Sequence, residues 1–541
     1  MGEELKHTPF GPGHRRDYRR KVQLCLDVFE TMLAQSSFDF EKPLTGMEIE
    51  CNLVDSQYQP AMSNSEVLAA IADPAYQTEL GAYNIEFNVP PRRLPGRAAL
   101  DLEADVRASL NAAEAKASTD GAHIVMIGIL PTLMPEHLTG SWMSESIRYQ
   151  ALNDSIFTAR GEDIMIDIAG PERLSLQTAS IAPESACTSM QLHLQVSPAD
   201  FADNWNAAQV LAGPQLALGA NSPFFFGHHL WSETRIELFA QATDTRPDEL
   251  KTQGVRPRVW FGERWITSIF DLFEENVRYF PSLLPELSDE DPVAELAEGR
   301  TPALSELRLH NGTIYRWNRP VYDVVNGRPH LRVENRVLPA GPTVLDMMAN
   351  SAFYYGALRA LSEEDRPLWT KMSFAAAHAN FLESAQRGMQ ARLYWPELGE
   401  VTPDELVLRQ LLPLADEARV AALCPDQEAL VRLSQRLELI GFYAFSPDTS
   451  RPGRAAGARM FAPYYGIAEE SATGMAAGPL ACFLHERMGV AGPRLLIEQG
   501  YLMHPPSPSL ITVDLKLARG RIEQLLAGGL ARVQHEVVLE L

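Results

Sequence analysis

Four separated segments of the chain alternate between apolar and polar residues. They cover residues 46–51, 83–89, 190–196 and 330–337. Because successive side chains of a β-strand point to opposite faces, each segment predicts a strand with one apolar and one polar face. The predicted polar faces carry Glu48 and Glu50, then Asn84, Glu86 and Asn88, then Gln191, His193 and Gln195, and finally His330, Arg332, Glu334 and Arg336.

Other stretches have helical periodicity. The spacing of apolar residues predicts helices over residues 20–36, 99–118 and 264–280, and the apolar run over residues 123–130, which ends at Pro131, predicts a buried strand. From about residue 343 onward the pattern is mostly helical, with interruptions at Pro and Gly clusters. We therefore expect a mixed α/β region over residues 1–345 and a mostly helical C-terminal region over residues 346–541.

The polar faces have an unusual composition for strands that merely face water. A solvated antiparallel sheet would also alternate, but its outer face is expected to carry mainly Thr, Lys, Ser and Glu. These four faces carry carboxylates, carboxamides, imidazole and arginine, and no lysine. We interpret them together as one functional face.

Carboxylates dominate this face and indicate its chemistry. Glu48, Glu50, Glu86 and Glu334 would repel one another in a shielded cleft unless a counter-charge were present. Mg²⁺ suits such a site because it prefers oxygen ligands and commonly binds carboxylates together with nucleotide phosphates. A neutral His193 could complete the ligand set, and the chain has no Cys/His cluster of the kind that binds zinc.

The last segment also carries two arginines on its polar face. The planar guanidinium groups of Arg332 and Arg336 can bind phosphate or carboxylate through two hydrogen bonds at once. The residues alone thus predict a magnesium–nucleotide site on an antiparallel sheet.

Composition excludes several other classes of function. The chain has 541 residues and a formal net charge of -23, which disfavours binding to nucleic acid or to an anionic membrane surface. It lacks an apolar stretch long enough to span a bilayer, and its first 20 residues lack the apolar stretch of a signal peptide. Five scattered cysteines without metal-type spacing are typical of reduced thiols, so we expect a cytoplasmic protein. A homo-oligomer is compatible with the sequence.

Six short motifs, in this order, resemble the glutamate–cysteine ligase family, particularly its bacterial and plant-type branch. They span about residues 40–360. The motifs are Gly46-Met47-Glu48-Ile49-Glu50, Asn84-Ile85-Glu86-Phe87-Asn88, Gln191-Leu192-His193, Ala220-Asn221-Ser222-Pro223-Phe224 with Gly227, Asn311-Gly312-Thr313-Ile314-Tyr315, and Val333-Glu334-Asn335-Arg336-Val337.

The resemblance implies an α+β fold akin to glutamine synthetase, with a curved antiparallel sheet that forms an active-site cleft and is covered by helices. It also implies an ATP- and Mg²⁺-dependent ligase, with Mn²⁺ as an alternative metal. Such an enzyme phosphorylates the γ-carboxylate of glutamate, and an amine then attacks the acyl phosphate. With cysteine as the amine the product is γ-glutamylcysteine, in the direction of glutathione biosynthesis.

The resemblance also assigns roles to individual residues. Metal-binding positions of the family match Glu48, Glu50, Glu86, His193 and Glu334. Arg336 matches an arginine that meets phosphate or the substrate carboxylate. Arg235 resembles an arginine that faces the nucleotide phosphates, although an ion pair with Glu233 or Glu237 is the alternative. Thr313 and Tyr315 are expected to line the nucleotide or substrate pocket. Arg332 is expected at the nucleotide, and Arg148 and Tyr149 at the substrate.

One departure keeps other interpretations open. Many relatives have Gly-Thr-His-Pro where this chain has Gly128-Ile129-Leu130-Pro131, and apolar residues replace the polar pair. Two alternatives therefore stand beside the cysteine ligase: a glutamate ligase with another amine acceptor, and a non-catalytic relative that binds a nucleotide or metabolite. Retention of all five metal-type positions argues against the second.

Overall fold

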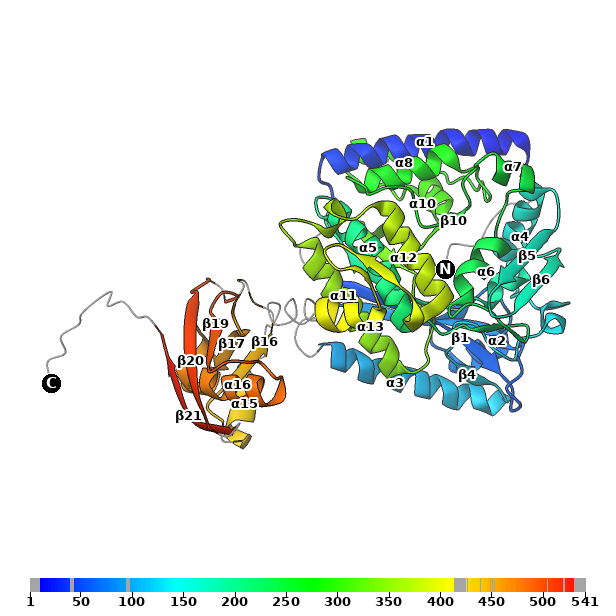
Figure 1. The fold of residues 1–541 in the computed structure, drawn as a ribbon. Coiled ribbons are helices and arrows are strands. Elements are labelled where there is room, and N and C mark those ends of the chain that lie inside the picture. The colour runs from blue at the N-terminus through cyan, green and yellow to red at the C-terminus, as the bar shows by residue number, and fades with distance from the viewer. Residues whose placement is uncertain are drawn as a thin grey trace. The chain divides into compact units, whose positions relative to one another are not determined.

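The computed structural model describes residues 10–38, 43–93, 98–412, and 425–529 apart from residues 426, 438, 448, 450, 452, 504, 519 and 520. Cys424 therefore lies outside the described residues. The chain divides into two compact units, Met1–Val407 and Leu408–Leu541 (Figure 1). This division comes later in the chain than the boundary expected near residue 345.

The first unit is built on a seven-stranded antiparallel sheet in its described part. Its strands lie in the order β12-β13-β7-β1-β3-β2, and β4 also pairs with β1. Their bounds are Thr45–Val54 (β1), Tyr76–Thr78 (β2), Asn84–Arg92 (β3), His123–Val125 (β4), Met190–Gln195 (β7), Asn318–Val325 (β12) and Arg328–Asn335 (β13). The four predicted strands are confirmed as β1, β3, β7 and β13, and they are consecutive neighbours in the sheet.

The strand register joins the four polar faces into one. Glu50 lies opposite Glu86, Glu48 lies opposite Gln191, and His193 lies opposite Glu334. Directly opposed residues of paired strands project from the same face of a sheet. The predicted polar positions therefore form one continuous surface.

Helices cover the apolar face of this sheet. Helix α5 (Phe201–Gly219) packs against α11 (Val344–Ser362) and α12 (Phe374–Arg387). The hydroxyl of Tyr355 on α11 donates to the carbonyl oxygens of Gly46 (3.1 Å) and His193 (3.0 Å), and Gln215 on α5 donates to Asn335 at 2.9 Å. These bonds fix the sheet to its helical layer.

The remaining elements of the first unit are short or lie around the sheet. Figure 1 shows α1 lying along α8, and both pack with α10. The other helices are α1 (Pro12–Ala34), α2 (Asn64–Ile71), α3 (Ala98–Ala117), α4 (Ile147–Arg160), α6 (Thr234–Ala242), α7 (Asp248–Thr252), α8 (Ile269–Tyr279), α9 (Pro292–Ala297), α10 (Ser305–Asn311) and α13 (Pro403–Leu406). Two-stranded ribbons are formed by β5 (Ile164–Ala169) with β6 (Arg173–Thr178), β8 (Phe224–Phe225) with β9 (His228–His229), β10 (Val259–Trp260) with β11 (Tyr315–Arg316), and β14 (Leu393–Trp395) with β15 (Gly399–Val401).

The predicted helices are confirmed as parts of α1, α3 and α8, but the predicted strand over residues 123–130 is mostly wrong. Only His123–Val125 pair as strand β4. Beyond them the backbone of Gly128 donates to Asn221 (3.3 Å) and accepts from Thr188 (2.9 Å), so these peptide groups bond outside the sheet. Ile129 and Leu130 are buried in the core all the same, which explains their apolar character.

The prediction of a mostly helical C-terminal region holds for α11 and α12 but is wrong for the second unit. The described part of this unit is a six-stranded sheet in the order β16-β17-β19-β20-β21, with β18 beside β17. Its elements are α15 (Gln427–Leu437), β16 (Phe442–Ser446), β17 (Ala456–Ala462), β18 (Ile467–Glu470), α16 (Gly474–Arg487), β19 (Arg494–Gln499), β20 (Ser509–Ala518) and β21 (Arg521–Gly528).

The reason for this error lies in the composition of the strands. Strands β19 and β20 contain several Leu residues, and Leu favours helices. In the structure, however, alternate residues of each strand point into one core with α16: Leu495 and Ile497 from β19, and Ile511, Val513 and Leu515 from β20. The Pro and Gly clusters at residues 446–457 and 503–508 fall between strands rather than between helices. In the described residues, no helix is both long and apolar enough to cross a membrane.

We predict that Leu192→Ala lowers the free energy of unfolding of the first unit by about 2–5 kcal/mol, because Leu192 is fully buried on the apolar face of β7. All eight tryptophans, from Trp142 to Trp395, belong to the first unit, so tryptophan fluorescence during denaturation reports on this unit alone. Leu345→Ala is the matched control, since Leu345 is 64% exposed and its loss should cost less than about 0.5 kcal/mol. Equal losses in the two variants would contradict the assigned core.

Candidate functional site

A cavity of about 430 Å³ lies over the polar face of the sheet. Its floor includes Glu48 and Glu50 from β1, Glu86 from β3, and Glu334 from β13. Residues of α4, α8 and α10 complete its walls, among them Tyr149, Phe273 and Arg308. The structure thus brings residues from across about 290 positions of sequence into one cavity, from Glu48 to Arg336.

Three carboxylates meet at one end of the cavity. Glu50, Glu79 and Glu86 each offer an oxygen atom within 4.8 Å of the others. Glu50 is further held by the Gln191 side chain, which donates to Oε1 at 2.8 Å, and by the backbone N–H of Ser189. Such a group of oxygen donors suits a hard divalent cation.

Sequence reasoning missed Glu79. It follows the three-residue strand β2, which is too short to establish an alternating pattern. Its carboxylate accepts from the backbone N–H of Leu80 at 3.2 Å, and it reaches the cluster because β2 pairs with β3, which carries Glu86. A single glutamate beside a short strand gave no signal for this position.

Burial and mutual repulsion raise the pKa of these carboxyls. Burial, and then the charge of Glu48, raises the pKa of Glu86 to about 7. The pKa of Glu79 is raised by burial and by the charges of Glu86 and Glu50. Glu184, also in the cavity wall, has its pKa raised to about 8 by burial and then by the charge of Glu50. This end of the cavity therefore favours either protons or a bound cation.

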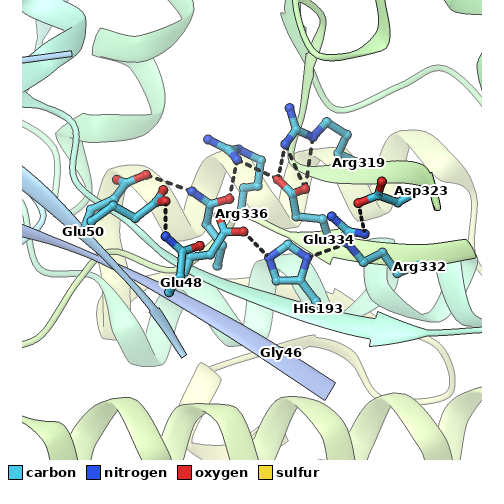
Figure 2. Close-up of polar contacts among 12 residues, drawn as sticks. Gly46, Glu48, Glu50, His193, Arg319, Asp323, Arg332, Glu334 and Arg336 are labelled. Carbon is cyan, nitrogen blue, oxygen red and sulfur yellow. Dashed lines mark hydrogen bonds and ion pairs between the residues drawn. The ribbon is translucent and has the colours of Figure 1, made fainter. Parts of the chain in front are cut away.

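Glu334, farther along the sheet, has the opposite environment (Figure 2). Arg319 donates to it from Nη2 at 2.8 Å and Arg336 donates from Nη1 at 2.6 Å. Burial would raise the pKa of Glu334, but these two arginines overcome it and hold the pKa well below its usual range. Arg319 was missed in the sequence because its strand, β12, shows no strict alternation of apolar and polar residues.

Arg336 is connected to the acidic cluster through Gln191. Its Nη1 donates both to Glu334 and to the Oε1 of Gln191, while the amide nitrogen of Gln191 donates to Glu50. The amide of Gln191 therefore has a fixed orientation between a cation and an anion. In the described part of the chain, the hydrogen bonds of the Arg336 guanidinium all come from Nη1, which leaves Nε and Nη2 available to a ligand.

His193 is held by two neighbours of opposite charge. Its Nδ1 accepts from Arg332 Nε at 3.1 Å, and its Nε2 lies 3.1 Å from Glu48 Oε1. Because arginine can only donate, the imidazole accepts at Nδ1 and turns Nε2 toward Glu48, within ion-pair distance. Burial would raise the pKa of Glu48, but His193 overcomes it and lowers the pKa to about 2. In this arrangement His193 orients Glu48 rather than presenting a lone pair to the cavity.

Arg332 belongs to a polar network at the edge of the cavity. Besides His193, its guanidinium contacts Asp323 Oδ2 at 3.1 Å and His330 Nε2 at 3.0 Å. Arg332 itself lines the cavity, as do Arg148, Tyr149 and Tyr315. The structure thus brings these four predicted residues to the same space as the acidic cluster.

Two other predicted residues are engaged elsewhere. Thr313 is buried, donates to the carbonyl of His310 at 2.9 Å, and lies outside the cavity lining. Arg235 reaches the cavity wall, but its Nε donates to Glu233 at 2.9 Å and its Nη1 and Nη2 donate to the carbonyls of Arg336 and Val337. The ion pair with Glu233 is the one considered from sequence, and through it Arg235 ties the start of α6 to the end of β13.

Comparison with known families gives two matches along the chain. The sequence model of glutamate-cysteine ligase family 2 (GCS2) matches residues 44–438, which include the whole cavity. The model of phenazine biosynthesis-like proteins (PhzC-PhzF) matches residues 357–535. The second match includes the described strands of the second unit.

Individual relatives cover only parts of the chain. An uncharacterized isomerase from Deinococcus radiodurans is 36% identical over 131 residues, 24% of this chain and 41% of that protein. The uncharacterized isomerase YddE of Escherichia coli is 39% identical over 75 residues, 14% of this chain and 24% of that protein. The chain thus matches about two fifths and about a quarter of the lengths of these relatives.

Two solved structures show distant likeness. A glutamate–cysteine ligase from Francisella tularensis in complex with AMP is 12% identical, with a TM-score of 0.44 over 72% of this chain and 80% of that chain. A bifunctional glutathione synthetase from Pasteurella multocida is 10% identical, with a TM-score of 0.37 over 77% of this chain and 49% of that chain. TM-scores below 0.5 do not by themselves establish a shared fold.

We predict that Glu86→Gln changes the pH dependence of stability in metal-free buffer. A carboxyl whose folded pKa is raised from 4.5 to about 7 contributes stability that is fully present below pH 4.5 and is lost as the pH rises through 7. The variant should therefore gain stability relative to the parent between pH 5 and pH 8, measured by denaturation followed through tryptophan fluorescence. Glu136→Gln is the control, because Glu136 is exposed. If the stability of Glu86→Gln follows the same pH dependence as that of the parent, the raised pKa of Glu86 is contradicted.

Proposed function

Because the chain belongs to glutamate-cysteine ligase family 2, we propose that it phosphorylates the γ-carboxylate of glutamate with ATP and joins the activated group to an amine. At the coarser level the protein is a carboxylate–amine ligase. Cysteine is the first candidate acceptor, which would give γ-glutamylcysteine, ADP and phosphate. The observation that carries the proposal is the cluster of Glu50, Glu79 and Glu86 in the same cavity as Arg336.

The acidic cluster supports a divalent metal in this role. Glu50, Glu79 and Glu86 would hold Mg²⁺ or Mn²⁺, since their oxygens already lie within 4.8 Å of one another. Glu48 and Glu334 face the same cavity and are candidates for further ligands. When bound, the metal would neutralise the charges of these carboxylates and of the nucleotide phosphates.

The chain's own residues would position and neutralise rather than form covalent bonds. The free nitrogens of Arg336 suit an oxygen of the phosphoryl group or of the carboxylate, and Gln191 keeps the guanidinium in place. Glu334 and Arg319 support Arg336 from the other side. Cys187 also lines the cavity, but burial raises its pKa well above the ordinary value, so its thiol suits packing better than nucleophilic attack.

Two alternatives differ from this proposal in their outcome. A glutamate ligase with a different acceptor is the first alternative, although Ile129 and Leu130, which motivate it, are buried outside the cavity lining. A non-catalytic relative that binds a nucleotide or metabolite would keep the cavity without turnover. An assay with a panel of amines separates the three.

We predict that ATP, Mg²⁺ and glutamate alone give slow ADP release, and that the correct amine accelerates it and yields a γ-linked amide. Steady-state ADP and phosphate release across a panel of amino acids and amines measures this, with the product identified by mass. Turnover with another amine but not cysteine would correct only the acceptor. Release of AMP and pyrophosphate would contradict the acyl-phosphate route, and binding without turnover would favour the non-catalytic alternative.

The same assay tests the metal. Chelation with EDTA should abolish ADP release, and added Mg²⁺ or Mn²⁺ should restore it, because the clustered carboxylates repel polyphosphate in the absence of a cation. Full activity after exhaustive chelation would remove the metal from the proposal.

We predict that Arg336→Lys is nearly as harmful as Arg336→Ala. A lysine ammonium cannot hold Gln191, Glu334 and a ligand oxygen in one plane, and loss of a charge-assisted hydrogen bond costs about 1.5–3 kcal/mol. We therefore expect kcat/KM to fall at least about tenfold. Arg359→Lys is the control, because Arg359 forms an exposed ion pair with Glu363, and this variant should keep the parental kinetics. Parental kinetics for Arg336→Lys as well would show that Arg336 is not part of the site.

A further inference from the structure

Asp323 is a carboxylate at the edge of the cavity that pairs with two arginines from different layers of the fold. It lies on β12, directly opposite His330 of β13. Its Oδ1 lies 2.7 Å from Nη2 of Arg308 on α10 and also accepts from the backbone N–H of Val324 at 2.9 Å. Its Oδ2 accepts from Nη1 of Arg332 on β13 at 3.1 Å. Both oxygens are therefore engaged, which fixes the orientation of the carboxylate.

The contacts continue from Asp323 to a candidate metal ligand. Arg332 Nε donates to Nδ1 of His193 at 3.1 Å, and Nε2 of the same ring lies 3.1 Å from Oε1 of Glu48. Figure 2 shows these four side chains joined one to the next from Asp323 to Glu48. Each comes from a different strand, in the order β12, β13, β7 and β1, which are consecutive neighbours in the sheet. The row thus crosses the sheet from its edge to the strand that carries Glu48.

The sheet fixes the backbone of His193 but not the rotation of its ring. The backbone pairs with β1 and β13, and its carbonyl accepts from the hydroxyl of Tyr355 at 3.0 Å. The imidazole can still turn about the bond between Cβ and Cγ, a torsion with broad preferences. Because Arg332 donates to Nδ1, that nitrogen is selected as the acceptor and Nε2 faces Glu48. The position of Glu48 therefore depends on where the Arg332 guanidinium is held.

Asp323 supplies the anion that holds this guanidinium. A free arginine side chain has many rotamers, and ordering it costs conformational entropy. A charge-assisted hydrogen bond to a carboxylate offsets that cost better than a neutral one. Burial would raise the pKa of Asp323, but the charges of Arg308 and then Arg332 overcome it and lower the pKa, so the carboxylate stays ionised near neutral pH.

We propose that Asp323 is a positioning residue for the metal site: it holds Arg332, Arg332 orients His193, and His193 orients Glu48. This inference rests on the proposed function, in which Glu48 is a candidate further ligand of the divalent metal. Asp323 itself does not touch the cation and acts only through the two side chains between it and Glu48.

Asp323→Ala tests this role, since it removes both carboxylate oxygens and leaves the candidate ligands in place. The full chain, stripped of metal and without substrates, is titrated with Mn²⁺, and free Mn²⁺ is followed by its EPR signal. We expect the Kd for Mn²⁺ to rise about tenfold, since loss of a side chain that orients a metal ligand commonly weakens binding to this extent. At saturating Mg²⁺, the KM for glutamate should change less than about twofold.

Arg332→Ala shows whether Asp323 acts through Arg332. This variant should also weaken Mn²⁺ binding, because it removes the donor to His193. Adding Asp323→Ala to it should change the Kd less than about twofold further, because residues that act through one another have non-additive effects. Losses that multiply in the double variant would overturn the inference, since Asp323 would then act by another route.

Asp167→Ala is the matched control, because Asp167 also lies on a strand and pairs with an arginine, Arg173, but both side chains are exposed. Its Kd for Mn²⁺ should stay within about twofold of the parental value. Thermal denaturation near the parental temperature shows that each variant is folded. If Asp323→Ala does not fold, Asp323→Asn replaces it and should raise the Kd at least about threefold, because the bond to Arg332 loses its charge.

Parental Mn²⁺ binding by a folded Asp323 variant overturns the inference and leaves the proposed function intact. Absence of Mn²⁺ binding by the parent would instead defeat the metal in the proposed function, and this inference would fall with it.

Discussion

Repulsion among carboxylates that share a shielded cavity is the constraint on which this site depends. Glu50, Glu79 and Glu86 gather their oxygens within 4.8 Å, and burial adds to the cost of their charges. The raised pKa of Glu86, about 7, expresses that cost directly. Such a cluster is stable near neutral pH only if protons or cations occupy it, so its presence favours a function that brings cations to the site.

The rest of the polar face distributes charge in the opposite way. Glu334 is neutralised by Arg319 and Arg336, and Glu48 lies against His193. Gln191 separates these two regions, since it accepts from Arg336 and donates to Glu50. One sheet surface therefore has an acidic end that needs a cation and a balanced end whose arginines can meet an anion, which is the pairing that a metal–nucleotide complex requires.

The second unit has a different basis for its stability. Its core lies between a mixed sheet and α16, and Arg459–Glu469 and Arg454–Glu498 form ion pairs within it. The match to phenazine biosynthesis-like proteins includes this unit, whereas the glutamate-cysteine ligase match ends at residue 438. The two matches overlap only in part, and the cavity over the polar face lies within the glutamate-cysteine ligase match.

The sequence by itself determined the four polar-faced strands and most of the residues on them, because a period of two is a local property that each strand carries alone. Glu48, Glu50, Glu86 and Glu334 were all found in this way. Only the tertiary structure decided that Glu79 and Glu184 join them, since each lies on a short segment without periodicity and reaches the cavity through strand pairing or packing.

Tertiary structure also decided which arginines are free. Arg235 and Arg336 are equivalent as charges in the sequence, yet the nitrogens of Arg235 are occupied by Glu233 and two backbone carbonyls, whereas Arg336 keeps two nitrogens available. The strands of the second unit were missed because their Leu and Ala residues favour helices locally, and only packing against α16 selects the extended form. Local pattern fixes the face of a strand, while long-range contacts fix its neighbours and its partners.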